Sequence, residues 1–204
     1  MTKKTPASNN ITATVSTISL VQREKRNRHR GCVLWFTGLS AAGKSTIANE
    51  LEAALFKLGC QTFVLDGDRV RHGLCSDLAF SETDRHENIR RVGEVANLFS
   101  EAGFICIAAF ISPYRADRNL VRAIASEKFV EVFVNAPLKI CEARDPKGLY
   151  AKARAKQIKN FTGVSAPYEP PMNPEIELHT DKLSVTEAVE KSLRYLKKFK
   201  FLKS

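Results

Sequence analysis

The sequence contains no apolar run of the roughly 18 residues that a membrane-spanning helix needs, so the chain is not expected to span a bilayer. It also lacks any CxxC pair, and its five cysteines are scattered without the clustered spacing of a zinc site. A structural metal site is therefore not expected. Isolated cysteines indicate reduced thiols in a compartment like the cytosol, and we expect a cytoplasmic protein.

The sequence also lacks an excess of positive charge in its central part. The net charge is +10, but residues 31–180 hold 18 basic and 18 acidic side chains. The excess lies in residues 1–30 and 181–204, whereas a nucleic-acid-binding domain would carry its basic stripe on the folded part. We expect no nucleic-acid or membrane partner. The alternative is that the tails bind a polyanion or an anionic membrane surface through the basic-aromatic run 197–201.

The chain length of 204 residues fits one domain, which we place at residues 31–204. Residues 1–30 are rich in Ser, Thr, Asn and Lys without a helical or strand period, which predicts a mobile basic N-terminal arm. The arm lacks the apolar core of a secretory signal. It is acid-poor like a transit peptide, but it has no arginine before Arg23, which favours the cytoplasm.

Short apolar runs alternate with amphipathic segments from Cys32 onward. Strands that are apolar on both faces and separated by helices predict a parallel sheet covered on both sides, which is the doubly wound α/β class. The predicted strands are 32–37, 62–65, 104–110, 129–134 and 176–179, and the predicted helices are 45–58, 84–102, 116–126 and a C-terminal one. Residues 144–163 interrupt this alternation and are rich in Lys and Arg, which is typical of a lid or binding loop.

The most specific motif is the run 38–45, GLSAAGKS, which matches G-x-x-x-x-G-K-[ST] between an apolar strand and a helix. Its glycines let backbone N–H groups surround a β-phosphate at a helix N-terminus. Lys44 would reach the β- and γ-phosphate oxygens, and Ser45 would offer its hydroxyl to Mg²⁺. The motif predicts a nucleotide site. The alternative is that the match is accidental and the run is an ordinary glycine-bearing turn.

Two carboxylates follow the second predicted strand, at Asp66 and Asp68. In a parallel sheet this strand end lies beside the phosphate loop, where ligands bind. One carboxylate can order the Mg²⁺ shell and the other can orient or deprotonate an acceptor hydroxyl, although a solvated Asp-Gly turn is the alternative. No N-K-x-D motif of a switch GTPase is present, so a small-molecule kinase is favoured.

Six separate motifs together resemble the adenylylsulfate kinase family, a P-loop kinase fold. They are the runs 38–46, 66–74, 84–94, 110–115, 144–150 and 161–163, within residues 31–180. The resemblance implies transfer of the γ-phosphoryl of MgATP to the 3′-hydroxyl of adenosine 5′-phosphosulfate (APS) in sulfate assimilation. It also implies Mg²⁺ as cofactor, a lid at about 144–163 and a homodimer. Another small-molecule P-loop kinase remains the main alternative.

The resemblance also assigns roles to residues. The catalytic set is Lys44, Asp68, Asp66 and Ser112, and the metal contacts are Ser45 and Asp68. The residues assigned to ATP are Gly38, Leu39, Ser40, Ala41, Ala42, Gly43, Lys44, Ser45, Thr46 and Arg144. The residues assigned to the acceptor are Arg71, Phe80, Arg85, Asn88, Ile111, Ser112, Lys159 and Phe161.

Several of these assignments keep a competing explanation. Phe80 and Phe161 lie in polar, turn-rich contexts, where a ring suits stacking on an adenine better than it suits a core, although ordinary loop packing is the alternative. Ser112 is expected to be an acceptor-binding hydroxyl, because in-line transfer needs no covalent step, while a phosphoserine intermediate is the other possibility. Arg69 stands where the family commonly has Asn, which leaves an Asn-specific contact in doubt.

Overall fold

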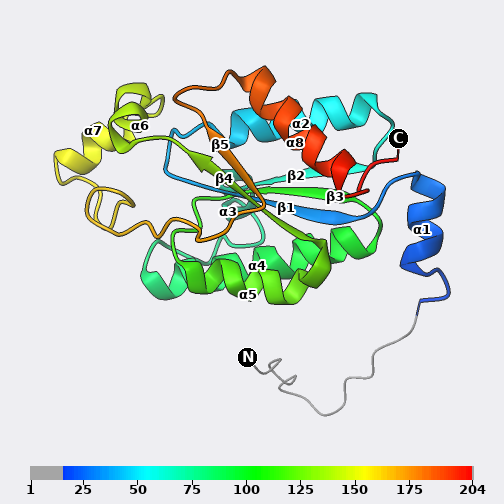
Figure 1. The fold of residues 1–204 in the computed structure, drawn as a ribbon. Coiled ribbons are helices and arrows are strands. Elements are labelled where there is room, and N and C mark those ends of the chain that lie inside the picture. The colour runs from blue at the N-terminus through cyan, green and yellow to red at the C-terminus, as the bar shows by residue number, and fades with distance from the viewer. Residues whose placement is uncertain (1–15, 204) are drawn as a thin grey trace, which may run out of the picture.

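The computed structural model describes residues 16–203 and contains a five-stranded parallel sheet with helices on both faces (Figure 1). The strand order is β2-β3-β1-β4-β5, and every neighbouring pair is parallel. The strands are β1 (Cys32–Thr37), β2 (Thr62–Asp66), β3 (Ile105–Ala109), β4 (Phe129–Asn135) and β5 (Ile176–His179). The predicted doubly wound α/β fold is confirmed.

The central strand β1 is buried along its whole length, since helices cover both of its faces. Leu34 and Phe36 point into the core on one side of the sheet, and Val33 and Trp35 point into the core on the other. This explains why the strand carries apolar residues at every position and shows no polar alternation. Its carboxyl end lies between the carboxyl ends of its two parallel neighbours, β3 and β4.

The helices divide between the two faces. Figure 1 shows α2 and α8 above the sheet and α4 and α5 below it, with α6 and α7 together at one end. These elements are α2 (Lys44–Lys57), α4 (Glu82–Glu101), α5 (Arg115–Ala125), α6 (Leu138–Arg144), α7 (Leu149–Arg154) and α8 (Val185–Lys198). The short helix α3 (Gly67–Arg71) follows β2, and the 3₁₀ turn η1 (Ser126–Lys128) precedes β4.

Local sequence signals set the helix starts. Ser81 accepts a hydrogen bond from the backbone N–H of Asp84 at the start of α4. Ser184 and Glu187 form a reciprocal capping box at the start of α8. Each cap satisfies backbone donors that the first helical turn leaves without intrahelical partners.

Residues 16–30 differ from the predicted mobile arm. They include a helix, α1 (Leu20–Asn27), whose Ser19 and Gln22 form another capping box. Its last residue, Asn27, donates its side-chain amide to the Gly103 carbonyl at 3.0 Å. The helical period is hard to see because the helix has eight residues and none is buried. The remainder of the predicted arm, residues 1–15, lies outside the described residues.

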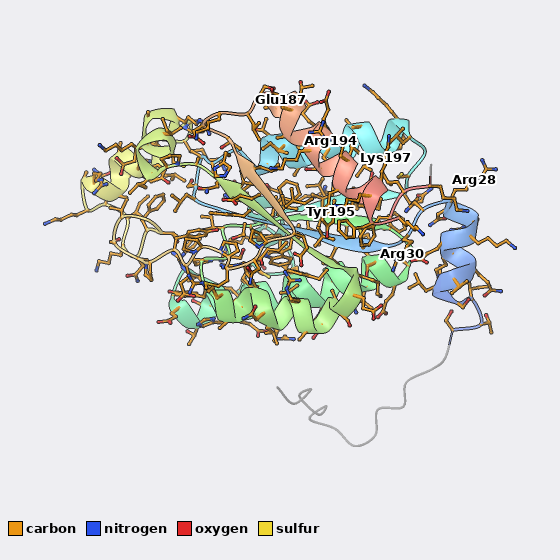
Figure 2. All side chains as sticks on the ribbon, in the orientation of Figure 1. Arg28, Arg30, Glu187, Arg194, Tyr195 and Lys197 are labelled. Carbon is orange, nitrogen blue, oxygen red and sulfur yellow. The ribbon has the colours of Figure 1, made fainter. Side chains whose placement is uncertain are left out.

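The basic segments at the two ends of the chain meet in space. His29 and Leu202 form an antiparallel bridge, and the backbone N–H of Arg30 donates to the Phe201 carbonyl at 2.8 Å. Figure 2 shows Arg28 and Arg30 near the C-terminal end of α8, where Lys197 is labelled. The basic side chains of residues 23–30 are thus brought close to the basic C-terminal end of α8. Within residues 16–203, no helix is both long and apolar enough to cross a membrane.

Gly31 offers a test of how the chain docks before β1. A Cβ at this position would lie 2.2 Å from the Ser100 carbonyl oxygen in the last turn of α4 and 3.2 Å from the Gly103 Cα just after that helix. We expect Gly31→Ala to lower the free energy of unfolding by roughly 1–3 kcal/mol, because the backbone must shift to relieve the overlap. Urea denaturation measures the change.

Gly73→Ala is the matched control, because a Cβ there meets nothing within 4 Å. It should leave the midpoint nearly unchanged. Equal stability of the wild type and the Gly31→Ala variant would contradict this docking.

Candidate active site

The phosphate loop joins β1 to α2 and has the backbone geometry that the motif requires. Gly38 and Gly43 adopt φ values of 149° and 103°, and Ala41 between them also has a positive φ of 58°. A Cβ on Gly38 would lie 2.4 Å from the Val134 carbonyl oxygen of β4. Gly38 must therefore be glycine on two counts, its φ and its close approach to β4.

Lys44 points its ammonium into this loop. The Nζ atom donates to the carbonyls of Gly38 at 2.9 Å and Leu39 at 2.7 Å, and the residue is 9% exposed. Burial lowers the pKa of Lys44 to about 8. The lysine is placed where an anion in the loop would meet its charge at low dielectric.

The two predicted carboxylates lie beside the loop but in different environments. The Ser45 hydroxyl donates to Asp66 Oδ2 at 2.7 Å, which joins the start of α2 to the end of β2. The other oxygen of Asp66 accepts from the backbone N–H of Asp68 at 3.0 Å and caps α3. Asp66, rather than Asp68, is therefore the carboxylate next to the predicted metal contact Ser45.

Asp68 instead faces the predicted lid. Its carboxylate pairs with the Lys147 ammonium, and this hydrogen bond raises the pKa of Lys147. Both side chains are mostly exposed, so the pair adds little stability. It nevertheless brings a cation from residues 144–163 to one of the two carboxylates, and Lys147 was absent from the predicted site residues.

The predicted lid contains a short helix, α7, which contacts the phosphate loop through Tyr150. The buried Tyr150 donates its hydroxyl to the Ser40 carbonyl at 3.0 Å. Phe161 packs edge-to-face on the same ring, with the centroids 5.0 Å apart, and is itself 8% exposed. The expectation that Phe161 is no core residue was wrong, because Tyr150 supplies an apolar partner from the lid helix.

Phe80 and Phe161 nevertheless belong to one arrangement, which Arg85 organises. The Arg85 guanidinium donates to the Phe80 carbonyl at 3.0 Å, the Asn160 carbonyl at 2.7 Å and the Thr162 hydroxyl at 2.9 Å. One arginine on α4 thus fixes the turn before α4 against the turn that carries Phe161. Lys159, assigned to the acceptor, is exposed in that second turn.

Two guanidinium groups lie near the ring of Phe80, which is 61% exposed. The Arg71 guanidinium carbon lies 4.4 Å from the ring centroid, and that of Arg85 lies 6.0 Å away. Arg71 also donates to the carbonyls of Leu78 and Ala79. The exposed ring and its cations form a surface suited to a flat, anionic ligand such as a nucleotide.

Asn88 lies one turn along α4 from Arg85 and is 3% exposed. Its Oδ1 atom has no hydrogen-bond partner among the residues that the structure describes. A buried carbonyl oxygen without a partner is costly, so a ligand donor at this position would be favourable. This observation supports the predicted acceptor role of Asn88.

Arg144 reaches the phosphate loop through an intermediate residue. It donates to the hydroxyl and the carbonyl of Thr180, and the Thr180 hydroxyl donates to the Ala42 carbonyl at 2.8 Å. Thr180 follows β5 and carried no recognisable motif in the sequence. The topology places β5 at the sheet edge beside β4, which brings Thr180 to the loop.

Ser112 follows β3 and is 2% exposed, with a positive φ of 38°. Its hydroxyl accepts a hydrogen bond from Trp35 Nε1 at 3.1 Å. The neighbouring Ile111 carbonyl accepts from the Thr37 hydroxyl at 2.8 Å. The hydroxyl of Ser112 is therefore oriented toward the core by Trp35, and no side chain in the described part of the chain is placed as its base.

An open groove of about 520 Å³ runs beside the loop, between Leu39 and residues 163–168. Its size falls in the range of small-molecule sites. All five cysteines are buried and free. Residues 16–203 also contain no cluster of three or more His, Cys, Asp or Glu that could hold a metal.

Comparison with known sequences gives one consistent family. The sequence model of the family described as adenylylsulphate kinase matches residues 30–179. An adenylyl-sulfate kinase of Escherichia coli O1:K1 / APEC is 59% identical over 184 residues, which cover 90% of this chain and 91% of the relative.

Two similar solved structures belong to the same family. The APS kinase CysC of Mycobacterium tuberculosis, in complex with AMPPNP and APS, superposes with a TM-score of 0.80 and 46% identity, covering 82% of this chain and 98% of that one. A hexameric APS kinase from Thiobacillus denitrificans has a TM-score of 0.68 and 33% identity, covering 90% of this chain and 32% of that one. Both similarities span most of the chain described above.

The buried Lys44 gives a pH prediction for ATP, the ligand that the loop motif predicts. A bound triphosphate stabilises the charged ammonium, whereas the free site begins to lose that proton near pH 8. Above this pH the Kd for ATP should rise by up to about tenfold per pH unit, with proton uptake on binding. Calorimetry in buffers of different ionisation heat from pH 7 to 9.5 measures both quantities.

The matched control is Lys147→Met, since the pKa of Lys147 is raised and not lowered. This variant should retain the same slope of affinity against pH. A Kd that is constant from pH 7 to 9.5 in the wild type would contradict the placement of Lys44.

Proposed function

This chain belongs to the adenylylsulphate kinase family, and we propose that its phosphate loop, Asp66, Asp68 and the Arg71–Phe80–Arg85 cluster carry out that family's reaction. The reaction transfers the γ-phosphoryl of ATP to the 3′-hydroxyl of APS and yields 3′-phosphoadenylyl sulfate and ADP. The observation that carries the assignment of residues is the convergence of Lys44, Ser45 and Asp66 at one sheet edge, with Ser45 Oγ 2.7 Å from Asp66 Oδ2.

On the donor side, the backbone N–H groups of the loop and the Lys44 ammonium bind the β- and γ-phosphates of ATP. Ser45 and Asp66 present hard oxygen donors, which fit Mg²⁺, and their small number suits an ion that is held mostly by water and phosphate. Bound there, Mg²⁺ would neutralise charge on the β- and γ-phosphate oxygens. Arg144 supports the donor side through Thr180 and Ala42.

On the acceptor side, the adenine stacks against Phe80, and Arg71 and Arg85 hold the phosphosulfate and sugar. The unpartnered Oδ1 of Asn88 accepts a hydrogen bond from the same ligand. Phe161 offers the second face of the base after a small adjustment against Tyr150. Phe80 and Phe161 are kept in register by Arg85.

Asp68 accepts the proton of the 3′-hydroxyl of APS. At the same time the 3′ oxygen forms a bond to the γ-phosphorus of ATP, and the bond between that phosphorus and the oxygen bridging it to the β-phosphate breaks, which releases ADP. Asp68 suits this role because Asp66 already contacts Ser45, which leaves the second carboxylate for the acceptor. Lys147, paired with Asp68, adds a cation from the lid where negative charge gathers.

Ser112 acts by binding and not as a phosphorylated intermediate in this proposal. Its burial and its hydrogen bond with Trp35 support that choice. Another acceptor, the alternative left open by the phosphate loop alone, is disfavoured by family membership. We also propose a homodimer, which light scattering tests, and a cytoplasmic location, which the five free cysteines support.

The division of labour between the two carboxylates predicts different variant phenotypes. Asp68→Asn should lower turnover by roughly 10²- to 10⁴-fold with MgATP affinity little changed, because a proton acceptor is lost. Asp66→Asn should weaken MgATP binding, with partial rescue by raised Mg²⁺ or by Mn²⁺. Steady-state kinetics with APS and equilibrium binding of MgATP separate the two effects.

The two variants serve as each other's control, since both replace a carboxylate by an amide of the same size. Metal rescue of Asp68→Asn without rescue of Asp66→Asn would reverse the two roles.

A further inference from the structure

Arg118 on α5 is a buried arginine that the reaction described above does not use. It is 2% exposed, and its guanidinium donates in three directions. The acceptors are Glu131 Oε1 at 2.7 Å, the Ser112 carbonyl at 2.6 Å and the Glu169 carbonyl at 2.6 Å. Burying a charge is costly, and a buried ion pair is weak evidence for added stability. The role of Arg118 therefore follows from the groups that its hydrogen bonds hold together.

The first carbonyl contact holds the end of β3. Ser112 has the positive φ of 38° that non-glycine residues rarely adopt, so its backbone is strained. Its carbonyl accepts from Arg118 and, at 3.4 Å, from the Thr37 hydroxyl. These donors stabilise the backbone of Ile111 and Ser112, the two acceptor-site positions that follow β3.

The second carbonyl contact holds the wall of the groove. Residues 163–168 line the groove beside Leu39, and Glu169 follows them directly. The ring of Tyr168 lies 5.9 Å from the Arg118 guanidinium carbon, and its hydroxyl lies 3.0 Å from Thr37 Oγ1. One guanidinium therefore joins the end of β3 to the groove wall.

Arg122, one turn further along α5, provides a contrast. It shares Glu131, at 3.3 Å, and pairs with Glu175 at 2.6 Å. None of its described hydrogen bonds reaches Ser112 or Glu169. The ion-pair network is therefore common to both arginines, whereas the carbonyl contacts belong to Arg118.

We propose that Arg118 is a positioning residue for the acceptor nucleotide. It sets the spacing between the Ile111–Ser112 backbone and the Tyr168–Glu169 segment, where the groove wall ends, and none of its described hydrogen bonds reaches the donor loop. This inference rests on the proposed function, because it assumes that APS binds between these two segments.

The test uses Arg118→Lys and Arg122→Lys in the full-length enzyme. A lysine at position 118 keeps the charge near Glu131, but one ammonium cannot span three acceptors at the same geometry. The KM for APS should rise about tenfold or more in Arg118→Lys, while the KM for ATP changes by less than about twofold. Arg122→Lys should leave both KM values near those of the wild type.

A rise of the two KM values by the same factor, or the same rise in Arg122→Lys, would overturn the proposal in favour of a purely structural role. Thr37→Val, of similar shape, covers the case in which Arg118→Lys does not fold, as judged by circular dichroism. It removes the hydroxyl that contacts Ile111 and Tyr168 and should raise the KM for APS selectively. An unchanged KM for APS in a folded Thr37→Val variant would also count against the proposal.

The wild type in the same assay separates a failure of the proposed function from a failure of the proposed role of Arg118. Absence of turnover with APS in the wild type would refute the proposed function itself. Turnover in the wild type with no selective change in the variants would refute only the role of Arg118.

Discussion

The close approach of Gly38 to β4 is the constraint on which the site depends. The loop leaves β1 against the Val134 carbonyl, where a side chain would overlap the backbone. This contact sets the loop at the carboxyl edge of the sheet, so the start of α2 lies next to the end of β2. Lys44 then points into the loop, and Ser45 meets Asp66. The donor half of the site follows from one backbone contact between neighbouring strands.

The acceptor half is built differently, from side chains that hold turns together. Arg85 joins the turn at Phe80 to the turn at Asn160, and Tyr150 joins the lid helix to Ser40 of the phosphate loop. Since Phe161 packs on Tyr150, a movement of the turn that carries Phe161 would shift Tyr150 and its hydrogen bond to the phosphate loop. These contacts connect the turn proposed to bind the acceptor with the phosphate loop within one domain.

The sequence was sufficient for the fold because each strand and helix carries its own periodic signal. The run 32–37 is apolar throughout, and the structure places it in the centre of the sheet. The phosphate loop and the pair Asp66–Asp68 were found for a similar reason, since their chemistry depends on local spacing. In contrast, Thr180 and Arg118 act through contacts between distant segments, which no local pattern records. Phe161 was misjudged because the partner that buries it, Tyr150, lies in a lid helix with no clear period.

In the proposed reaction, this site phosphorylates the 3′-hydroxyl of APS. The most direct measurement is ADP release with MgATP and a panel of acceptors that includes APS, shikimate, gluconate and free nucleosides, followed by identification of the phosphorylated position by NMR. We expect efficient turnover with APS alone and a single product with the new phosphate on the 3′ oxygen. Comparable turnover with another acceptor, or a phosphate at a different position of APS, would contradict it.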